Sequence, residues 1–234
     1  MSQSRKQFFE QRLADAGKDM CLRAMDWVVE EMSAAKGYSR HDGSDYFSHC
    51  IDAAQDLYNF GIRDEDVISA ALLHDIVEDV PGITLRMVEG QFNSNVARMV
   101  GLVTKNPSID YKKGDALKHM YLNPILGNAG ASLIKTSDRK HNFSTLRHAT
   151  SEKKIRQANE TEQFFFPFFK EAMKRYPRYS AYFLSAKTAI KPHLLEIQEH
   201  YEDVTKLQER IRDLENQLLH IHRPDESFCN QNFI

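Results

Sequence analysis

The sequence predicts an all-α protein. Glycine and proline are sparse, at 10 and 7 of 234 residues, so few positions interrupt a helix. Apolar residues recur at intervals of three and four along most of the chain, whereas the alternation typical of strands is scarce. Hydrophobic residues make up 41% of the chain, which is enough for a packed core. The length fits one large domain, or one domain with an appendage.

In the N-terminal half, apolar periodicity predicts helices over residues 5–35 (one or two), 46–60, 65–80, 84–90 and 93–104. Gly61 lies just past the end of the second of these, as a C-terminal glycine does. Asp64 is placed to cap the next helix, and Thr84 to start the one after. Pro81 and Gly82 end the helix predicted over residues 65–80.

In the C-terminal half, the same periodicity predicts helices over residues 115–127, 130–147, 150–175 and 180–190. Thr150 or Ser151 caps the third of these helices, and Pro167 interrupts it and kinks it.

The apolar positions of the tail follow a heptad pattern. They are Ile190, Leu194, Ile197, Tyr201, Val204, Leu207, Ile211, Leu214, Leu218 and Ile221, with one three-residue slip between Val204 and Leu207. A single amphipathic helix lying on the core would give a similar pattern, but the dense charge between these positions favours a coiled coil. We therefore expect residues 191–222 to form a helical tail that makes a homo-oligomer, followed by a loose C-terminus over residues 223–234.

Four polar side chains interrupt the apolar helix of residues 68–80, "ISAALLHDIVEDV". They are His74, Asp75, Glu78 and Asp79. Charged side chains are rarely buried unless they are paired or bind a metal. In a continuous helix, His74 stacks on Glu78 and Asp75 on Asp79, one turn apart. His74 and Asp75 then reach one cavity from neighbouring sides.

One histidine and one aspartate are too few to hold a divalent metal, so other helices must supply ligands. His49 and Asp138 lie in similar helical settings. Two histidines and two aspartates suit Mn²⁺, Fe²⁺ or Zn²⁺ with water in the open positions. A metal-bound water is a hydrolytic nucleophile near neutral pH, and Glu78 and Asp79 are placed to orient or deprotonate it.

These residues also allow a purely structural reading. An HD dipeptide is common, and Asp138 precedes Arg139 and Lys140, so a surface salt bridge would account for it equally well. By composition alone, four further histidines could be ligands: His41, His119, His141 and His148. His119 lies in a weakly patterned segment and is predicted to be a surface residue.

Five segments share a known pattern in their order along the chain. They are "RHDGSDYFSH", "AALLHDIVEDV", "GITLRMVEGQFNSNVARMVGLVTK", "LIKTSDRKHNFSTL" and "RQANETEQFFFPFF", all within about residues 20–175. Together they closely resemble the hydrolase domain of the RelA/SpoT alarmone enzymes, a subset of the HD-domain metal phosphohydrolases. This resemblance implies an HD-domain helical bundle over residues 1–190.

The resemblance also implies roles for single residues. The metal, usually Mn²⁺ in this family, would be held by His49, His74, Asp75 and Asp138. Glu78 and Asp79 would act on the attacking water and the leaving group. Arg40 would contact the guanine base, Asn142 the sugar, and Lys105 and Lys135 the phosphates. Tyr46 and His41 would also contact the substrate. His41 occupies a position where a lysine is common in the family.

The implied reaction is hydrolysis of the 3′-diphosphate of ppGpp or pppGpp, which gives GDP or GTP and pyrophosphate. About 60 residues follow the hydrolase-like region, where long members of the family carry a synthetase domain, so a small stand-alone hydrolase is expected. The segment "KNPSIDYKKGD" is less typical. Another HD phosphohydrolase, acting on NADPH, a dNTP or a signalling nucleotide, and a non-catalytic nucleotide-binding module are therefore alternatives.

The bulk properties restrict partners and location. A net charge of −2 gives no sign of nucleic-acid or membrane-surface binding. Apolar runs are too short to span a bilayer, and the charged N-terminus does not resemble a secretory signal. Three cysteines without paired spacing argue against a disulfide framework. We expect a cytoplasmic protein with a nucleotide substrate.

Overall fold

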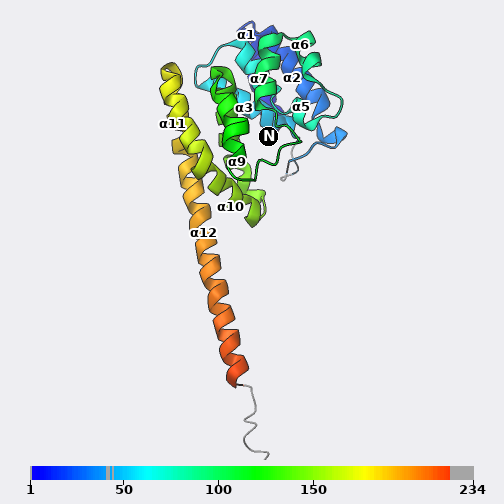
Figure 1. Cartoon of the computed structure of the whole chain (residues 1–234). Coiled ribbons are helices and arrows are strands. Elements are labelled where there is room, and N and C mark those ends of the chain that lie inside the picture. The colour runs from blue at the N-terminus through cyan, green and yellow to red at the C-terminus, as the bar shows by residue number, and fades with distance from the viewer. Residues whose placement is uncertain (1, 41–42, 44, 222–234) are drawn as a thin grey trace, which may run out of the picture.

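The computed structural model describes residues 2–40, 43 and 45–221, and within these ranges the regular structure is helical (Figure 1). An isolated bridge pairs Ser39 with Asp45. The all-α prediction is confirmed. His41, expected to contact the substrate, and the C-terminal residues 223–234, expected to be loose, lie outside the described residues.

The N-terminal half packs as a cluster of short helices around a common core. They are α1 (Ser2–Asp15), α2 (Asp19–Glu31), η1 (Ala34–Lys36), α3 (Phe47–Asn59), α4 (Glu65–Leu72), α5 (Ile76–Asp79), α6 (Leu85–Gln91) and α7 (Ser94–Val103). The predicted signals at their ends are present. Gly61 follows α3 with φ +95°, Asp64 accepts hydrogen bonds from the N–H groups of Asp66 and Val67, and Thr84 accepts one from Met87.

The C-terminal half contains the two longest helices of the described residues, α9 and α12, together with shorter ones. They are η2 (Leu117–Leu122), α8 (Asn123–Leu126), α9 (Ala129–Thr145), η3 (Leu146–His148), α10 (Ser151–Glu160), η4 (Thr161–Phe165), α11 (Phe166–Arg175), η5 (Pro177–Tyr179) and α12 (Ser180–Ile221). Thr150 caps α10 by accepting a hydrogen bond from the Lys153 N–H. The predicted interruption at Pro167 takes the form of a π-helical turn, η4, directly before α11.

One expectation about helix continuity is wrong. The helix predicted over residues 65–80 is broken at residues 73–75, between α4 and α5. The helix predicted over residues 180–190 and the helical tail predicted after it form one helix, Ser180–Ile221, of 42 residues that passes through Pro192. Proline cannot bond the carbonyl four residues earlier, but Thr188 and Pro192 are both exposed, so water can reach that carbonyl.

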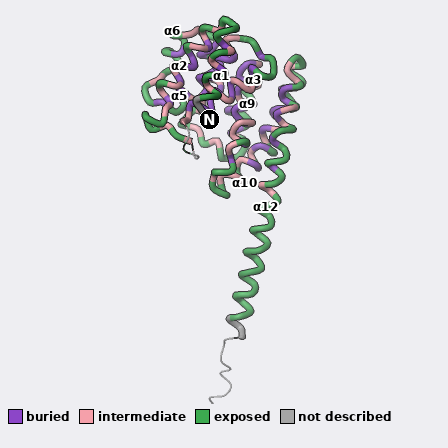
Figure 2. Tube along the Cα trace, turned by 180° about the vertical axis from the view of Figure 1, so that it is seen from behind, coloured by how far each residue is buried: buried purple, intermediate pink, exposed green. Residues whose placement is uncertain are grey.

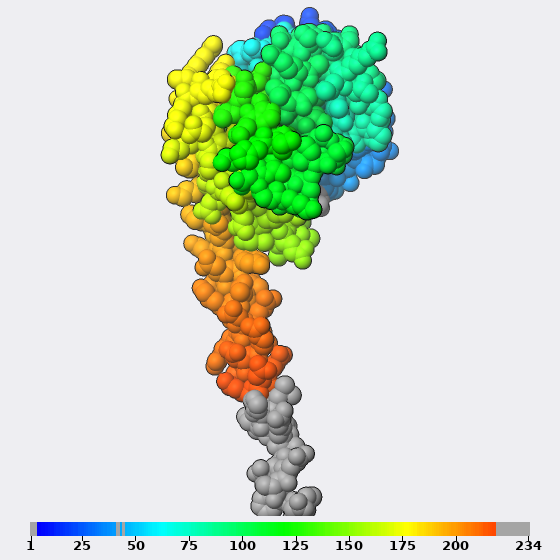
Figure 3. All heavy atoms as spheres, viewed as in Figure 1, coloured from blue at the N-terminus to red at the C-terminus, as the bar shows by residue number. Residues whose placement is uncertain are grey.

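The long helix α12 belongs to the core at one end only. Its first turns pack against α9, α10 and α11, where Tyr182, Phe183 and Ile190 are fully buried. Leu194 is still buried at 1% exposed, whereas residues 199–218 are exposed (Figure 2). That half of the helix projects from the body of the molecule (Figure 3). None of the helices within the described ranges is long and apolar enough to cross a membrane.

Candidate metal centre and adjoining cavity

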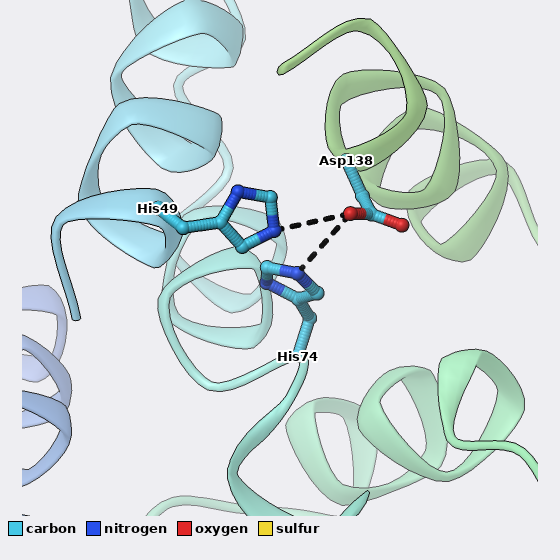
Figure 4. A group of neighbouring side chains, drawn as sticks. All are labelled: His49, His74 and Asp138. Atoms are coloured by element: carbon cyan, nitrogen blue, oxygen red, sulfur yellow. Dashed lines mark hydrogen bonds and ion pairs between the residues drawn. The ribbon is translucent and has the colours of Figure 1, made fainter. Parts of the chain in front are cut away.

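Three elements bring the four predicted metal ligands together. His49 comes from α3, His74 from the turn between α4 and α5, and Asp138 from α9 (Figure 4), and Asp75 follows His74 in the same turn. His49 Nε2 lies 3.1 Å from Asp138 Oδ1 and 3.7 Å from Asp75 Oδ2. His74 Nε2 lies 3.2 Å from Asp75 Oδ2 and 3.8 Å from Asp138 Oδ1. Two imidazoles and two carboxylates therefore converge on one point, although 89 residues separate His49 from Asp138.

The break in the helix at residues 73–75 gives His74 its orientation. Leu73 (φ −100°, ψ 5°) and Asp75 (φ −101°, ψ −7°) leave the helical region, so α4 ends here. His74 Nδ1 lies 2.8 Å from the carbonyl oxygen of Ala71, to which it donates a hydrogen bond at the end of α4. Since Nδ1 carries this proton, Nε2 is the ring nitrogen that can give its lone pair to a metal in the cluster.

A chain of side chains orients His49 in the same way. His49 Nδ1 lies 2.6 Å from His141 Nδ1, and His141 Nε2 lies 3.2 Å from Asp52 Oδ2. Arg5 donates to the same carboxylate at 2.7 Å. In the arrangement that satisfies the contacts behind the ring and leaves Nε2 for a metal, His49 donates to His141, and His141 donates to Asp52. His49 Nε2 then carries a lone pair toward Asp138.

His141 was predicted only as one of several alternative ligands. It lies behind His49 instead, on the side away from the carboxylates of the cluster. The spacing of three residues from Asp138 places both residues on one face of α9, and this was the available signal. The contribution of Asp52 and Arg5 was not predicted, because it depends on how α1 and α3 pack together.

The electrostatics of the cluster favour bound positive charge. Burial lowers the pKa of His49 to about 4, so its ring is neutral at pH 7. Burial opposes protonation of His74, but Asp75 outweighs it and raises the His74 pKa well above its ordinary value. Burial also opposes ionisation of Asp138, yet Lys135 and the two imidazoles keep its pKa well below the usual range. Nε2 of His74 is buried and makes no hydrogen bond.

The donor set fits a divalent metal. Several lone-pair atoms face one another, and the described part of the chain offers no N–H or O–H that bonds His74 Nε2. His49, His74 and Asp138 present ligand atoms within 4.8 Å of one another. Cys50 also lies near His74 and Asp75, but burial raises the pKa of its thiol, which makes it a poor ligand at neutral pH. Nitrogen and oxygen ligands suit Mn²⁺, Fe²⁺ or Zn²⁺.

Three of the predicted substrate-contact residues lie against the ligand carboxylates. Lys135 Nζ donates to Asp138 Oδ2 at 2.6 Å, and Asn142 Nδ2 donates to Asp138 Oδ1 at 2.6 Å. The Tyr46 hydroxyl donates to Asp75 Oδ2 at 2.9 Å. These contacts fix the direction in which Asp75 and Asp138 point.

Glu78 and Asp79 form part of the short helix α5 directly after the HD pair. The Glu78 carboxylate accepts a hydrogen bond of 2.9 Å from the Lys105 backbone N–H, which holds the segment after α7 beside the cluster. Desolvation, together with the nearby Asp75 carboxylate, raises the pKa of Asp79 to about 6. A carboxyl group with such a pKa can both accept and donate a proton near neutral pH.

Two lysines form a cationic pair at the edge of the cluster. The ammonium groups of Lys105 and Lys135 lie 5.6 and 5.2 Å from the centre of the Tyr121 ring. Burial and the charge of Lys135 lower the pKa of Lys105. Like charges held together in this way favour a bound polyanion.

A cavity of about 260 Å³ adjoins the metal ligands. Tyr46 and Asn142 line it and also bond the ligand carboxylates, so the cavity and the cluster share a wall. Arg40 lies over the Tyr46 ring at 5.5 Å and donates to Thr145 Oγ1 at 2.7 Å. The remaining lining residues were not predicted: Ser39, Leu146, His148, Ala149, Lys153 and Gln157.

Comparison with known proteins identifies the class to which this fold and site belong. The family model described as "HD domain" matches residues 24–171. The chain therefore belongs to the HD-domain family.

Individual relatives and a solved structure show which members of the HD-domain family the chain is similar to. The chain is 32% identical over 154 residues to the bifunctional (p)ppGpp synthase/hydrolase SpoT of Escherichia coli K12, covering 64% of this chain and 22% of that protein. It is 30% identical over 143 residues to the GTP pyrophosphokinase rsh of Brucella melitensis, covering 59% and 19%. A solved structure described as a metazoan ortholog of SpoT that hydrolyses ppGpp matches with a TM-score of 0.51 and 21% identity, covering 78% of this chain and 95% of that one.

The solved structure supports the fold. The chain spans about a fifth of the length of the curated relatives it matches. These relatives are named as SpoT and related enzymes, in agreement with the RelA/SpoT resemblance of the sequence motifs.

Proposed function

We propose that this protein hydrolyses the 3′-diphosphate of ppGpp or pppGpp to GDP or GTP and pyrophosphate, with Mn²⁺ as the preferred metal. The observation that carries the proposal is the shared wall between the His/Asp cluster and the cavity containing Arg40. A nucleoside held in that cavity would place its phosphates at the cluster. The names of the relatives supply the substrate class.

A divalent ion held by His49, His74, Asp75 and Asp138 would supply Lewis acidity and a water molecule of lowered pKa. The rest of the chemistry falls to the chain itself. Glu78 and Asp79 orient the attacking water, take its proton and return one to the leaving oxygen. The leaving oxygen is the ribose 3′-oxygen, and Lys105 and Lys135 balance the negative charge on the attacked diphosphate, which is released as pyrophosphate.

The cavity residues select the nucleoside. The Arg40 guanidinium and the Tyr46 ring form an adjacent planar pair suited to a flat base. Asn142 bonds Asp138 through its amide nitrogen, and its amide oxygen can accept a hydrogen bond from a sugar hydroxyl. Lys153, also in the lining, adds positive charge on the side of the cavity formed after α9.

The test is a product assay on the purified full chain. The protein is stripped with EDTA, reloaded with Mn²⁺, and incubated separately with ppGpp, pppGpp, GTP, a dNTP and NADPH, with products resolved by mass. We expect GDP and pyrophosphate in equal amounts from ppGpp, and no turnover before the metal is restored. Asp138→Ala should lose both bound metal and turnover. Release of orthophosphate, or turnover of dNTP or NADPH alone, would reject the proposed substrate, and binding of ppGpp without turnover would reject the enzyme.

A further inference from the structure

The projecting half of α12 carries an exposed apolar stripe. Val204, Leu207, Ile211 and Leu214 are 36%, 64%, 55% and 42% exposed. They lie within residues 202–218, which stand clear of the helical core over about 25 Å at 1.5 Å per residue (Figures 2 and 3). A helix in a protein gains most of its stability from the packing of its amphipathic face rather than from helix propensity. A regular apolar stripe on such a helix indicates a surface that is covered by a partner.

The structure explains the slip in the heptad pattern. Ile190 and Leu194, which precede it, are buried in the core, and Ile197 packs against the core from a partly buried position. The slip consists of two successive steps of three, from Tyr201 to Val204 and from Val204 to Leu207, and from Val204 onward the steps of three and four alternate. The slip therefore marks the change from packing within the chain to packing against a partner.

We infer that the partner is a second copy of this chain, aligned in parallel as a two-stranded coiled coil through α12. In the unbroken register, Val204, Ile211 and Leu218 occupy the a positions, and Leu207 and Leu214 occupy the d positions. β-branched side chains at a with leucine at d favour parallel two-stranded coiled coils over trimers and tetramers.

The charged residues beside the stripe favour the same alignment. Arg210 falls at a g position and Glu215 at the following e position. In a parallel pair, each g residue faces the next e residue of the second copy. Arg210 thus meets Glu215 of the second copy, and symmetry repeats the contact on the other side. In an antiparallel pair, g residues face g residues, and this contact is absent.

The first experiment measures the mass of the full chain by light scattering coupled to gel filtration. We expect about twice the monomer mass of 27.1 kDa. Leu207→Lys combined with Leu214→Lys should halve that mass. Thr205→Lys combined with Asn216→Lys adds the same charge at the outward b and f positions and should leave it unchanged. Circular dichroism checks that each variant keeps its helical core.

Three outcomes would contradict a parallel dimer. A full chain that stays monomeric at every concentration measured would overturn the inference. A full chain that remains a dimer after Leu207→Lys and Leu214→Lys would also overturn it. A full chain that forms a trimer or tetramer, which the two lysines dissociate, would do the same.

The second experiment tests the direction of pairing. Arg210→Glu places two glutamates opposite each other in a parallel pair, so the dimer dissociation constant should rise severalfold. Adding Glu215→Arg to that variant should restore the dimer. If the double variant stays as weak as the single one, the pairing is not parallel, because an antiparallel pair does not bring residues 210 and 215 together. Both experiments are independent of the enzymatic activity.

Discussion

His74 illustrates how a single residue joins the fold to the site. Its Nδ1 bonds the Ala71 carbonyl at the end of α4, and its Nε2 faces Asp75 and Asp138. The sequence predicted the second contact, because polar side chains in an apolar segment are rarely buried without a metal or a charged partner. It did not predict the first, since a helix without glycine or proline gives no sign of a break. At residues 73–75, the tertiary contacts of His74 and Asp75 override the local helix propensity.

His141 provides the sharpest prediction at this scale. His141→Ala removes the acceptor that fixes the His49 ring, so we expect the dissociation constant for Mn²⁺ to rise about 10–100-fold. Calorimetric titration of the stripped protein measures this value. His141→Asn retains an acceptor oxygen and should restore part of the affinity, whereas His119→Ala, an exposed histidine, should have no effect. Equal affinity in the wild type and His141→Ala would show that His49 needs no such support.

Glu78 can be separated from the metal ligands by a substitution that keeps its shape. Glu78→Gln retains an oxygen to accept the Lys105 N–H, so the local backbone should hold. We expect bound Mn²⁺ to remain at one per chain while kcat for ppGpp falls about 10²–10⁴-fold, since proton transfer is lost. Metal analysis and initial rates on the same preparation give both values. A variant that loses metal as well as rate would place Glu78 among the ligands.

Among the elements, helix ends were the most predictable features. Asp64, Thr84 and Thr150 accept the hydrogen bonds expected of capping residues. These signals are local, so neighbouring residues suffice to identify them. The π-helical turn η4 was not predicted in form, although Pro167 indicated the interruption. The orientations that bring His49 to Asp138 depend on packing between distant helices. Their helical settings made both residues candidate ligands, and the RelA/SpoT resemblance favoured them over the other histidines.

The cap of α4 can be tested by its effect on stability. Asp64→Ala leaves the N–H groups of Asp66 and Val67 without their acceptor, so the free energy of unfolding should fall by about 0.5–2 kcal/mol. Urea denaturation in the presence of EDTA measures this loss without a contribution from bound metal. Asp26→Ala, at an exposed position inside α2, is the matched control and should lose nothing. A loss of the same size in both variants would contradict the assignment of Asp64 as a cap.

At the scale of the whole molecule, the sequence divides into an enzyme-like core and a tail, but the physical division lies within α12. The predicted boundary at residue 190 falls in the middle of a helix whose Leu194 side chain is 1% exposed. Heptad periodicity continues across this point, so the pattern alone cannot say where contacts with the core end. The exposure of the side chains shows that contacts with the core end close to residue 198.

Two truncations follow from this division. A chain ending at residue 198 keeps Leu194 and Ile197, so it should retain the kcat for ppGpp of the full chain within about twofold while its mass falls to that of a monomer. A chain ending at residue 191 also loses Leu194, and burial of one leucine contributes about 1.5–3 kcal/mol. It should therefore unfold at lower urea concentration. Light scattering, urea denaturation and ppGpp turnover on the three chains measure these effects. If the chain ending at residue 198 is monomeric and inactive, the core needs its partner for activity, and the tail is part of the catalytic unit rather than an appendage.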